Sequence, residues 1–167
     1  MNQALHIQTQ QQFLSIALSQ EHWALLPTVQ LVEILQIDFS SIAEIPGMPA
    51  AVMGVYPTAP SLLWIVDLVQ LSGLNSTTVP KQCSVLKINT QWGSLGYFVR
   101  QVGKLMTIDS TAIERPDAST VFKATIPHLP ETCQQGIWRT PQGKTLPILN
   151  TEAIAKYSAT FSTHGPY

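Results

Sequence analysis

Few side chains in this sequence have the types and spacing that catalysis or metal binding requires. The histidines and cysteines that could supply a base, a nucleophile or a metal ligand are His6, His22, His128, His164, Cys83 and Cys133. Cys83 with His128 could be considered as a nucleophilic dyad, but the sequence contexts of cysteine hydrolases are missing. The cysteines form no CxxC pair and have no histidine at metal-ligand spacing. We expect both to be reduced, buried thiols.

The carboxylates do not form a pair suited to general acid–base catalysis. Glu33 and Glu44 are eleven residues apart on separate predicted elements, and Asp67 stands where it would cap a helix. The sequence contains no GxSxG, no HExxH and no glycine-rich phosphate loop ahead of a helix. We therefore predict a binding protein that has no enzymatic activity and needs no cofactor or metal.

Composition and charge disfavour several kinds of partner. The chain has 167 residues, of which 45% are hydrophobic and only 11% are charged. Its net charge of −1 gives little support for nucleic-acid binding through phosphate neutralisation. No apolar run approaches the roughly 18 residues of a membrane-spanning helix, and residues 1–12 lack the features of a secretory signal. We expect a cytoplasmic protein without direct membrane insertion, and residues 1–12 as a disordered polar lead.

The predicted elements occur twice in the same order. Strands are predicted at 13–18 and 83–88, and each is followed by a polar turn and a return arm that begins with tryptophan. Each half then has a glycine in a strand and, 13 or 14 residues later, a residue suited to cap a short helix. These residues are Gly54 and Asp67 in the first half, and Gly136 and Asn150 in the second.

This repeat predicts two divergent copies of about 70–80 residues, each with roughly five short strands. Five short twisted strands close best as a small barrel, because closure removes exposed sheet edges. The first barrel is expected at about 13–75 and the second at about 82–157, with a tail at 158–167. The turn at 45–49 contains two prolines that fix φ, and Gly47 supplies freedom there.

Several short segments, taken in order, resemble a known family. They are the strand 13–18, Leu31-Val32-Glu33-Ile34 against the pattern V-x-E-I, the turn 45–49 against V-P-x-x-P, Gly54-Val55, the stretch 65–68 against P-V-V/I-D-L, the stretch 95–99 against V-G-L-x-V, and the segments 113–116 and 136–150. Together they resemble the CheW-like domain, the adaptor fold of bacterial chemosensory systems, over residues 13–157.

The resemblance implies a mainly β fold of two small SH3-like five-stranded barrels packed together, with short helices. It also implies an adaptor without catalysis, located in the cytoplasm and associated with membrane receptor arrays. Its partners would be the regulatory domain of a CheA-type histidine kinase, through barrel-to-barrel contacts, and the cytoplasmic hairpin tip of a receptor. The receptor tip would dock in a groove near the junction of the two halves.

The sequence departs from the family at positions that matter for binding. Where the family reads N-L-R-G, this chain has Tyr56 to Ser61, without arginine or glycine and with two prolines. We therefore expect a diverged adaptor from a pilus-related or other non-motility pathway. The alternative is an SH3-like double-barrel module that binds a peptide or an unrelated signalling partner. The expected partner-binding residues are Glu33, Tyr56, Pro57, Thr58, Ala59, Pro60, Trp64, Val99 and Arg100; Gly47, Gly54, Asp67, Gly136 and Asn150 are expected to be structural.

Two further expectations concern charge. Glu33 is expected either to pair with Lys104 or to face a partner. Residues 1–80 carry no lysine or arginine and a charge of −5, whereas residues 81–167 carry +4. If each half formed one barrel, this asymmetry would favour weak, salt-sensitive head-to-tail self-association, or association with the matching kinase domain, which reversal of Lys87 and Lys104 would weaken.

Overall fold

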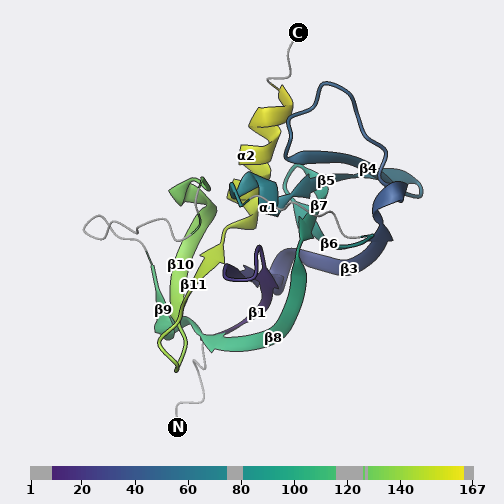
Figure 1. Ribbon diagram of the computed structural model, residues 1–167. Coiled ribbons are helices and arrows are strands. Elements are labelled where there is room, and N and C mark those ends of the chain that lie inside the picture. The colour runs from purple at the N-terminus through teal and green to yellow at the C-terminus, as the bar shows by residue number, and fades with distance from the viewer. Residues whose placement is uncertain (1–8, 75–80, 116–125, 127, 164–167) are drawn as a thin grey trace.

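The chain forms two curled β-sheets that lie side by side, with a helix between them (Figure 1). The computed structural model describes residues 9–74, 81–115, 126 and 128–163. The strands are β1 (Gln10–Ala17), β2 (Trp23–Pro27), β3 (Leu31–Asp38), β4 (Val52–Thr58), β5 (Ser61–Asp67), β6 (Gln82–Thr90), β7 (Gly93–Val99), β8 (Gln101–Asp109), β9 (Ile113–Glu114), β10 (Gln134–Arg139) and β11 (Thr145–Leu149). The helices are α1 (Leu68–Leu71) and α2 (Thr151–Thr163), with single 3-10 turns at η1 (Thr28–Gln30), η2 (Phe39–Ser41), η3 (Ser110–Ala112) and η4 (Glu131–Cys133).

The two sheets exchange strands between the halves of the sequence. The five-stranded sheet has the order β3-β6-β7-β5-β4, and the six-stranded sheet has the order β8-β1-β2-β11-β10-β9. The first two strands of each half therefore pair with the later strands of the other half. The assignment of one barrel to 13–75 and the other to 82–157 does not hold, although the order of elements within each half is the predicted one.

The physical reason for the exchange lies in two parallel pairings. Strand β5 runs parallel to β7, with Trp64 opposite Leu95, and β11 runs parallel to β2, with Ile148 opposite Leu25. A tight hairpin cannot join parallel strands, so these contacts form only between segments that are distant along the chain. Consecutive strands are often neighbours, which is why the sequence pattern favoured contiguous barrels.

Most of the buried apolar residues belong to a cluster that both sheets share. This shared cluster contains Leu26 of β2, Ile88 of β6, Tyr97 of β7, Leu149 of β11 and Ile154 of α2, all of them essentially inaccessible to solvent. Two smaller clusters are confined to single sheets, one within the five-stranded sheet and α1 and the other within the six-stranded sheet. The two curled sheets are therefore held together by one continuous apolar core.

The two predicted cap residues begin the two α-helices. The backbone N–H of Gln70 donates to Asp67 Oδ1 at 3.1 Å, and that of Ala153 donates to Asn150 Oδ1 at 3.1 Å. Helix α2 continues to Thr163, so much of the predicted tail 158–167 is helical. At the other end, residues 10–12 are not a disordered lead, because they extend β1 beside β8. Residues 1–8 and 164–167 lie outside the described residues.

Two glycines allow close backbone approach within the sheets. A Cβ on Gly54 would lie 2.1 Å from the carbonyl oxygen of Ala43, and the φ of Gly54 is +141°. A Cβ on Gly136 would lie 2.8 Å from Ile113 Cγ2. A side chain at either position would push the neighbouring segment away. Gly47 has a φ of +81° in the turn that follows Pro46.

The strand exchange also changes the distribution of charge. Residues 28–99, which supply the five-stranded sheet, contain the acids Glu33, Asp38, Glu44 and Asp67 and the bases Lys81 and Lys87, a net −2. The rest of the chain is therefore +1, since the total is −1. The contrast of −5 against +4 does not describe two separate surfaces, and the self-association argued from it loses its electrostatic basis.

Asp67 gives a testable effect of pH on stability. Burial raises the pKa of this carboxyl above its ordinary value, although hydrogen bonds from the backbone of Gln70 and Val69 and the charge of Arg100 act in the opposite direction. A raised pKa in the folded state means that the stabilisation is full below the ordinary value of about 4 and is lost as the pH rises through the raised value.

We expect Asp67→Asn to keep the cap and to be at least as stable as the wild type at pH 7, because asparagine is also a good N-cap. This advantage should disappear below about pH 4, where the wild-type carboxyl is protonated. Asp67→Ala should lose about 1 kcal/mol through loss of the cap. Urea denaturation at several pH values measures these differences. An Asp67→Asn variant less stable than the wild type at pH 7 would contradict the raised pKa of Asp67.

Candidate protein-docking surfaces

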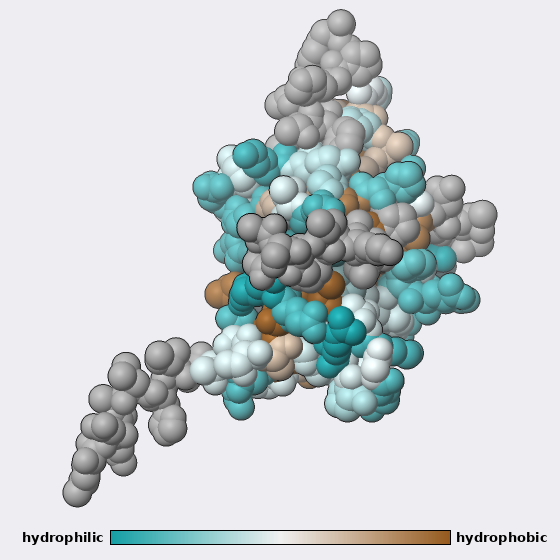
Figure 2. All heavy atoms as spheres, turned by 90° about the vertical axis from the view of Figure 1, so that its left-hand side faces the viewer, coloured by the Kyte–Doolittle hydropathy of each residue, from teal (hydrophilic) through white to brown (hydrophobic). Residues whose placement is uncertain are grey.

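Exposed apolar side chains are concentrated on the five-stranded sheet and its connections. Among the described residues the large exposed ones are Val29, Val32, Ile34, Phe39, Ile45, Leu62, Trp64, Trp92 and Leu105, and all except Leu105 lie within residues 28–99. Figure 2 views the molecule from the side of β9 and β10, where the described residues are mostly hydrophilic and apolar colour is confined to small areas. The five-stranded sheet is therefore the better candidate for docking a partner.

The first candidate surface is the η1–β3 strip, which we define as Val29, Val32 and Ile34. Val29 is 88% exposed, and the other two are also exposed. Among the described strands, β3 is an edge strand that pairs with β6 alone, so its second edge is not hydrogen-bonded to any of the others. The strip therefore combines apolar side chains with an open strand edge, a combination that favours contact with another protein.

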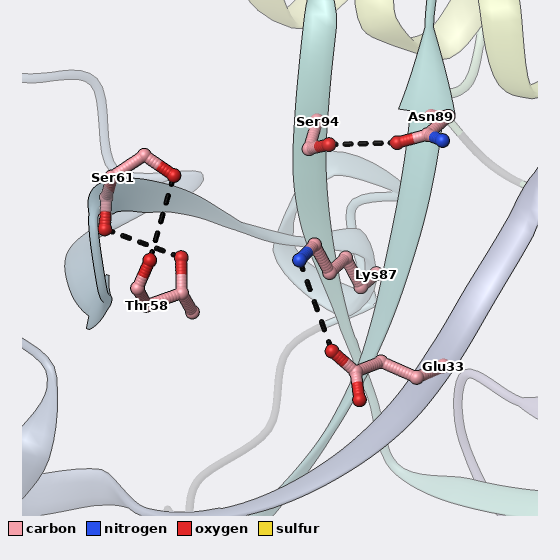
Figure 3. Close-up of polar contacts among 6 residues, drawn as sticks. All are labelled: Glu33, Thr58, Ser61, Lys87, Asn89 and Ser94. Carbon is pink, nitrogen blue, oxygen red and sulfur yellow. Dashed lines mark hydrogen bonds and ion pairs between the residues drawn. The ribbon is translucent and has the colours of Figure 1, made fainter.

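Glu33 lies between Val32 and Ile34 on β3 and forms an ion pair other than the one considered from the sequence. Its Oε1 is 3.8 Å from Lys87 Nζ on the neighbouring strand β6 (Figure 3). Its ion-pair partner is therefore Lys87 and not Lys104. Close by, Ser94 Oγ donates to Asn89 Oδ1 at 2.7 Å between β6 and β7. A half-exposed pair of this kind contributes about 0–1 kcal/mol to stability. Little stability would therefore be lost if the Glu33 carboxylate left Lys87 to bind a partner.

The second candidate surface is the hairpin of β4 and β5. Thr58 Oγ1 donates to the Ser61 carbonyl at 3.2 Å and Ser61 Oγ donates to the Thr58 carbonyl at 3.5 Å, so the two strands are held together up to a turn at Ala59 and Pro60 (Figure 3). Pro57, Ala59 and Pro60 are exposed. Pro57, Thr58 and Ser61 are thus strand residues, and the tip has a fixed shape.

Tyr56 and Val99 are not the exposed contact residues that the sequence suggested. Tyr56 is half-buried and packs against the cluster inside the five-stranded sheet. Val99 is fully buried in the shared cluster, because residues 97 and 99 of β7 face the six-stranded sheet. Arg100 is exposed at the bend after β7, where its backbone N–H donates to the Ala17 carbonyl at 2.9 Å. Of these three residues, only Arg100 is exposed.

The third candidate surface is a groove of about 420 Å³ between the five-stranded sheet and α2. We call it the Trp64 groove, and its lining consists of Met48, Val52, Trp64, Val66, Thr90, Trp92, Leu95, Ala155 and Ser158. Trp64 is 38% exposed and Trp92 is 55% exposed. The sequence pointed to Trp64 but not to Trp92, whose place directly after a polar turn was the available signal. It did not point to α2 either, because the tail was expected to begin at Ser158.

The two cysteines lack the properties of nucleophiles. Both are buried, and burial raises the pKa of the Cys83 and Cys133 thiols above the ordinary value. Such thiols stay protonated near neutral pH, and the protonated form is a poor nucleophile.

Within the part of the chain that the structure describes, no three histidine, cysteine or acidic side chains come together in a way that could hold a metal ion. The described helices include none with the length and apolar character needed to cross a membrane.

Two interleaved curled sheets around one core, with three exposed apolar surfaces, define a protein-binding scaffold. A family model described as the CheW-like domain matches residues 12–159. The chain belongs to this family, and it is by class a chemosensory scaffold or adaptor. This confirms the resemblance seen in the sequence.

A solved structure agrees with this assignment at the level of fold. The chain is similar to the scaffolding protein TtCheW from Thermoanaerobacter tengcongensis, with a TM-score of 0.71 and 20% sequence identity over 85% of this chain and 90% of that chain. The similarity confirms the mainly β, two-barrel SH3-like fold. A comparison with curated proteins gives no match.

Proposed function

We propose that this protein is a non-catalytic adaptor that couples a chemosensory receptor to a CheA-type histidine kinase. The observation that carries the proposal is the family match over residues 12–159, which spans both sheets and the shared cluster. CheW-like proteins in general bind chemoreceptors and CheA. The exposed apolar surfaces of the five-stranded sheet supply places for two such partners.

The hairpin of β4 and β5 is the proposed docking surface for the kinase's regulatory domain. Its tip presents Pro57, Pro60 and Leu62 to solvent, and Leu62 is 61% exposed. The Thr58–Ser61 hydrogen bonds already fix the tip, so little conformational entropy is lost when a partner binds. A barrel of the kinase domain would meet this apolar tip.

The η1–β3 strip is the proposed surface for the cytoplasmic hairpin tip of a receptor. Its three apolar side chains suit the apolar stripe of a helix, and Glu33 suits a basic residue beside that stripe. The tip of the β4–β5 hairpin has no arginine, unlike the N-L-R-G segment of the family. This departure supports a diverged, pilus-related or other non-motility pathway.

Capture of kinase domains on the immobilised full chain tests the proposal. We expect the wild type to retain the regulatory domain of a CheA-type kinase from the same organism at micromolar concentration. Leu62→Asp should weaken capture at least tenfold, because it places a charge in an apolar contact. Leu105→Asp is the matched control, since Leu105 is 63% exposed but lies on β8 of the other sheet.

Two outcomes would count against the proposal. If the wild type retains no CheA-type kinase, the coupling function is wrong, and the alternative of a double-barrel module for an unrelated signalling partner takes its place. The altered segment from Tyr56 to Ser61 is the observation that favours this alternative. If Leu62→Asp and Leu105→Asp bind the kinase equally well, the hairpin is not the docking surface.

Replacement of the hairpin tip tests whether the missing arginine affects kinase docking. Exchange of Pro57–Pro60 for Asn-Leu-Arg-Gly should strengthen binding to the regulatory domain of a CheA-type kinase from a motility pathway. Loss of one charged interface hydrogen bond typically costs about 2–5 kcal/mol, so its restoration should tighten binding more than tenfold. Surface plasmon resonance measures the change. Asn-Leu-Gln-Gly is the control, and equal binding by both replacements would exclude an effect of the arginine.

A further inference from the structure

The lining of the Trp64 groove restricts the chemistry of a ligand. None of the described residues that line it is charged, and most are aliphatic or aromatic. A charged ligand group would lose its hydration there without meeting an opposite charge, which is unfavourable. The groove is therefore suited to an uncharged segment.

The hydroxyl groups in the lining already have hydrogen-bond partners within the protein. Thr90 Oγ1 donates to the Gly93 carbonyl at 2.7 Å, and Ser158 Oγ donates to the Ile154 carbonyl at 2.8 Å. By contrast, the indole N–H groups of Trp64 and Trp92 donate to no acceptor among the described residues. A ligand that covers these two rings must offer acceptors, because a buried donor without a partner is costly.

We propose that the Trp64 groove binds an uncharged, proline-rich extended segment of a partner protein. Such a segment adopts the polyproline II conformation, whose backbone carbonyls form no internal hydrogen bonds. Proline rings would pack on the exposed faces of Trp64 and Trp92, and the segment's carbonyls would accept hydrogen bonds from the two indole N–H groups. This inference goes beyond the coupling of receptor and kinase and does not depend on it.

A helical occupant fits the groove less well. A helix uses its own carbonyls in its internal hydrogen bonds, so its apolar face would cover the two indole N–H groups without offering acceptors. The wall on α2 consists of the small residues Ala155 and Ser158, which leave room beside the tryptophans for pyrrolidine rings. An extended segment of a few residues also suits a groove of about 420 Å³.

Titration of the full chain with a decaproline peptide tests the proposal. We expect the indole N–H resonances of Trp64 and Trp92 to shift in proton–nitrogen NMR spectra, while those of Trp23 and Trp138 stay in place. Trp64→Phe and Trp92→Phe keep an aromatic face but remove the donor, so each should weaken binding about three- to tenfold. Trp138→Phe is the control, because Trp138 packs in the six-stranded sheet.

Several results would overturn the proposal. One is the absence of shifts at millimolar decaproline, and another is unchanged affinity in the Trp64→Phe and Trp92→Phe variants. Tighter binding of a neutral helical peptide of the same length would show that a helix is the occupant. Sedimentation of the wild type as a dimer that Trp64→Phe converts to a monomer would show that a second copy occupies the groove. Kinase capture is measured separately, so either proposal can fail without the other.

Discussion

A fragment that contains only residues 1–80 should remain unfolded. In the intact protein β1 pairs with β8, β2 with β11, β3 with β6 and β5 with β7, so the fragment loses a neighbour of four of its five strands. It also loses Ile88, Tyr97, Leu149 and Ile154 from the shared cluster. An isolated hairpin is at best marginally stable in water, so the two remaining hairpins cannot compensate.

Circular dichroism and amide NMR dispersion of the separate fragments measure this effect. We expect residues 1–80 and residues 81–167 each to show an unfolded spectrum, and a mixture of the two to recover the β-sheet signal. Recovery on mixing is the control for chemical damage or aggregation of either fragment. A well-dispersed spectrum from residues 1–80 alone would mean that the halves fold independently and that the strand exchange is wrong.

Ile88→Ala should destabilise both sheets at once. Ile88 is fully buried in the shared cluster, and truncation of such a residue to alanine typically costs about 2–5 kcal/mol. Because the cluster contains residues of β1, β2, β5, β6, β7, β11 and α2, the loss cannot be confined to the sheet that contains β6. Amide hydrogen exchange should therefore become faster in β1 and β2 as well as in β6 and β7.

The control for this variant is Leu105→Ala, which shortens a mostly exposed side chain. A surface substitution of this kind should change the free energy of unfolding by less than about 0.5 kcal/mol. Faster exchange restricted to β6 and β7 in Ile88→Ala would indicate two independently stable sheets, contrary to the expectation from the shared cluster.

The strands and helix starts could be predicted from the sequence because they depend on local signals. Alternating apolar residues predicted the hairpins of β1 with β2 and of β6 with β7, and Asp67 and Asn150 predicted the starts of α1 and α2. The parallel pairs could not be predicted in this way. The pairing of β5 with β7 and of β2 with β11 depends on the apolar core that forms between distant segments. No residue near β5 or β2 indicates which strand will lie beside it.

The same difference between local and distant signals explains which features of the candidate site could be predicted from the sequence. Pro57, Ala59 and Pro60 are exposed as a turn sequence predicts, and Trp64 is exposed on a strand that also has buried positions. Val99 could not be placed from the sequence, because both faces of β7 are apolar and only the position of the second sheet shows which face is covered. The Trp64 groove was missed in part because α2 forms one of its walls.

The shared cluster has a mechanical consequence for the proposed coupling of two partners. In a protein of two independent domains joined by a flexible linker, movement of one partner would bend the linker. The displacement would not reach the other domain. Here four inter-strand pairings join the two halves of the chain, and α2 packs into the same core. We therefore expect a force on the η1–β3 strip to move the whole molecule as one rigid body. The hairpin tip of β4 and β5 would then move together with the strip.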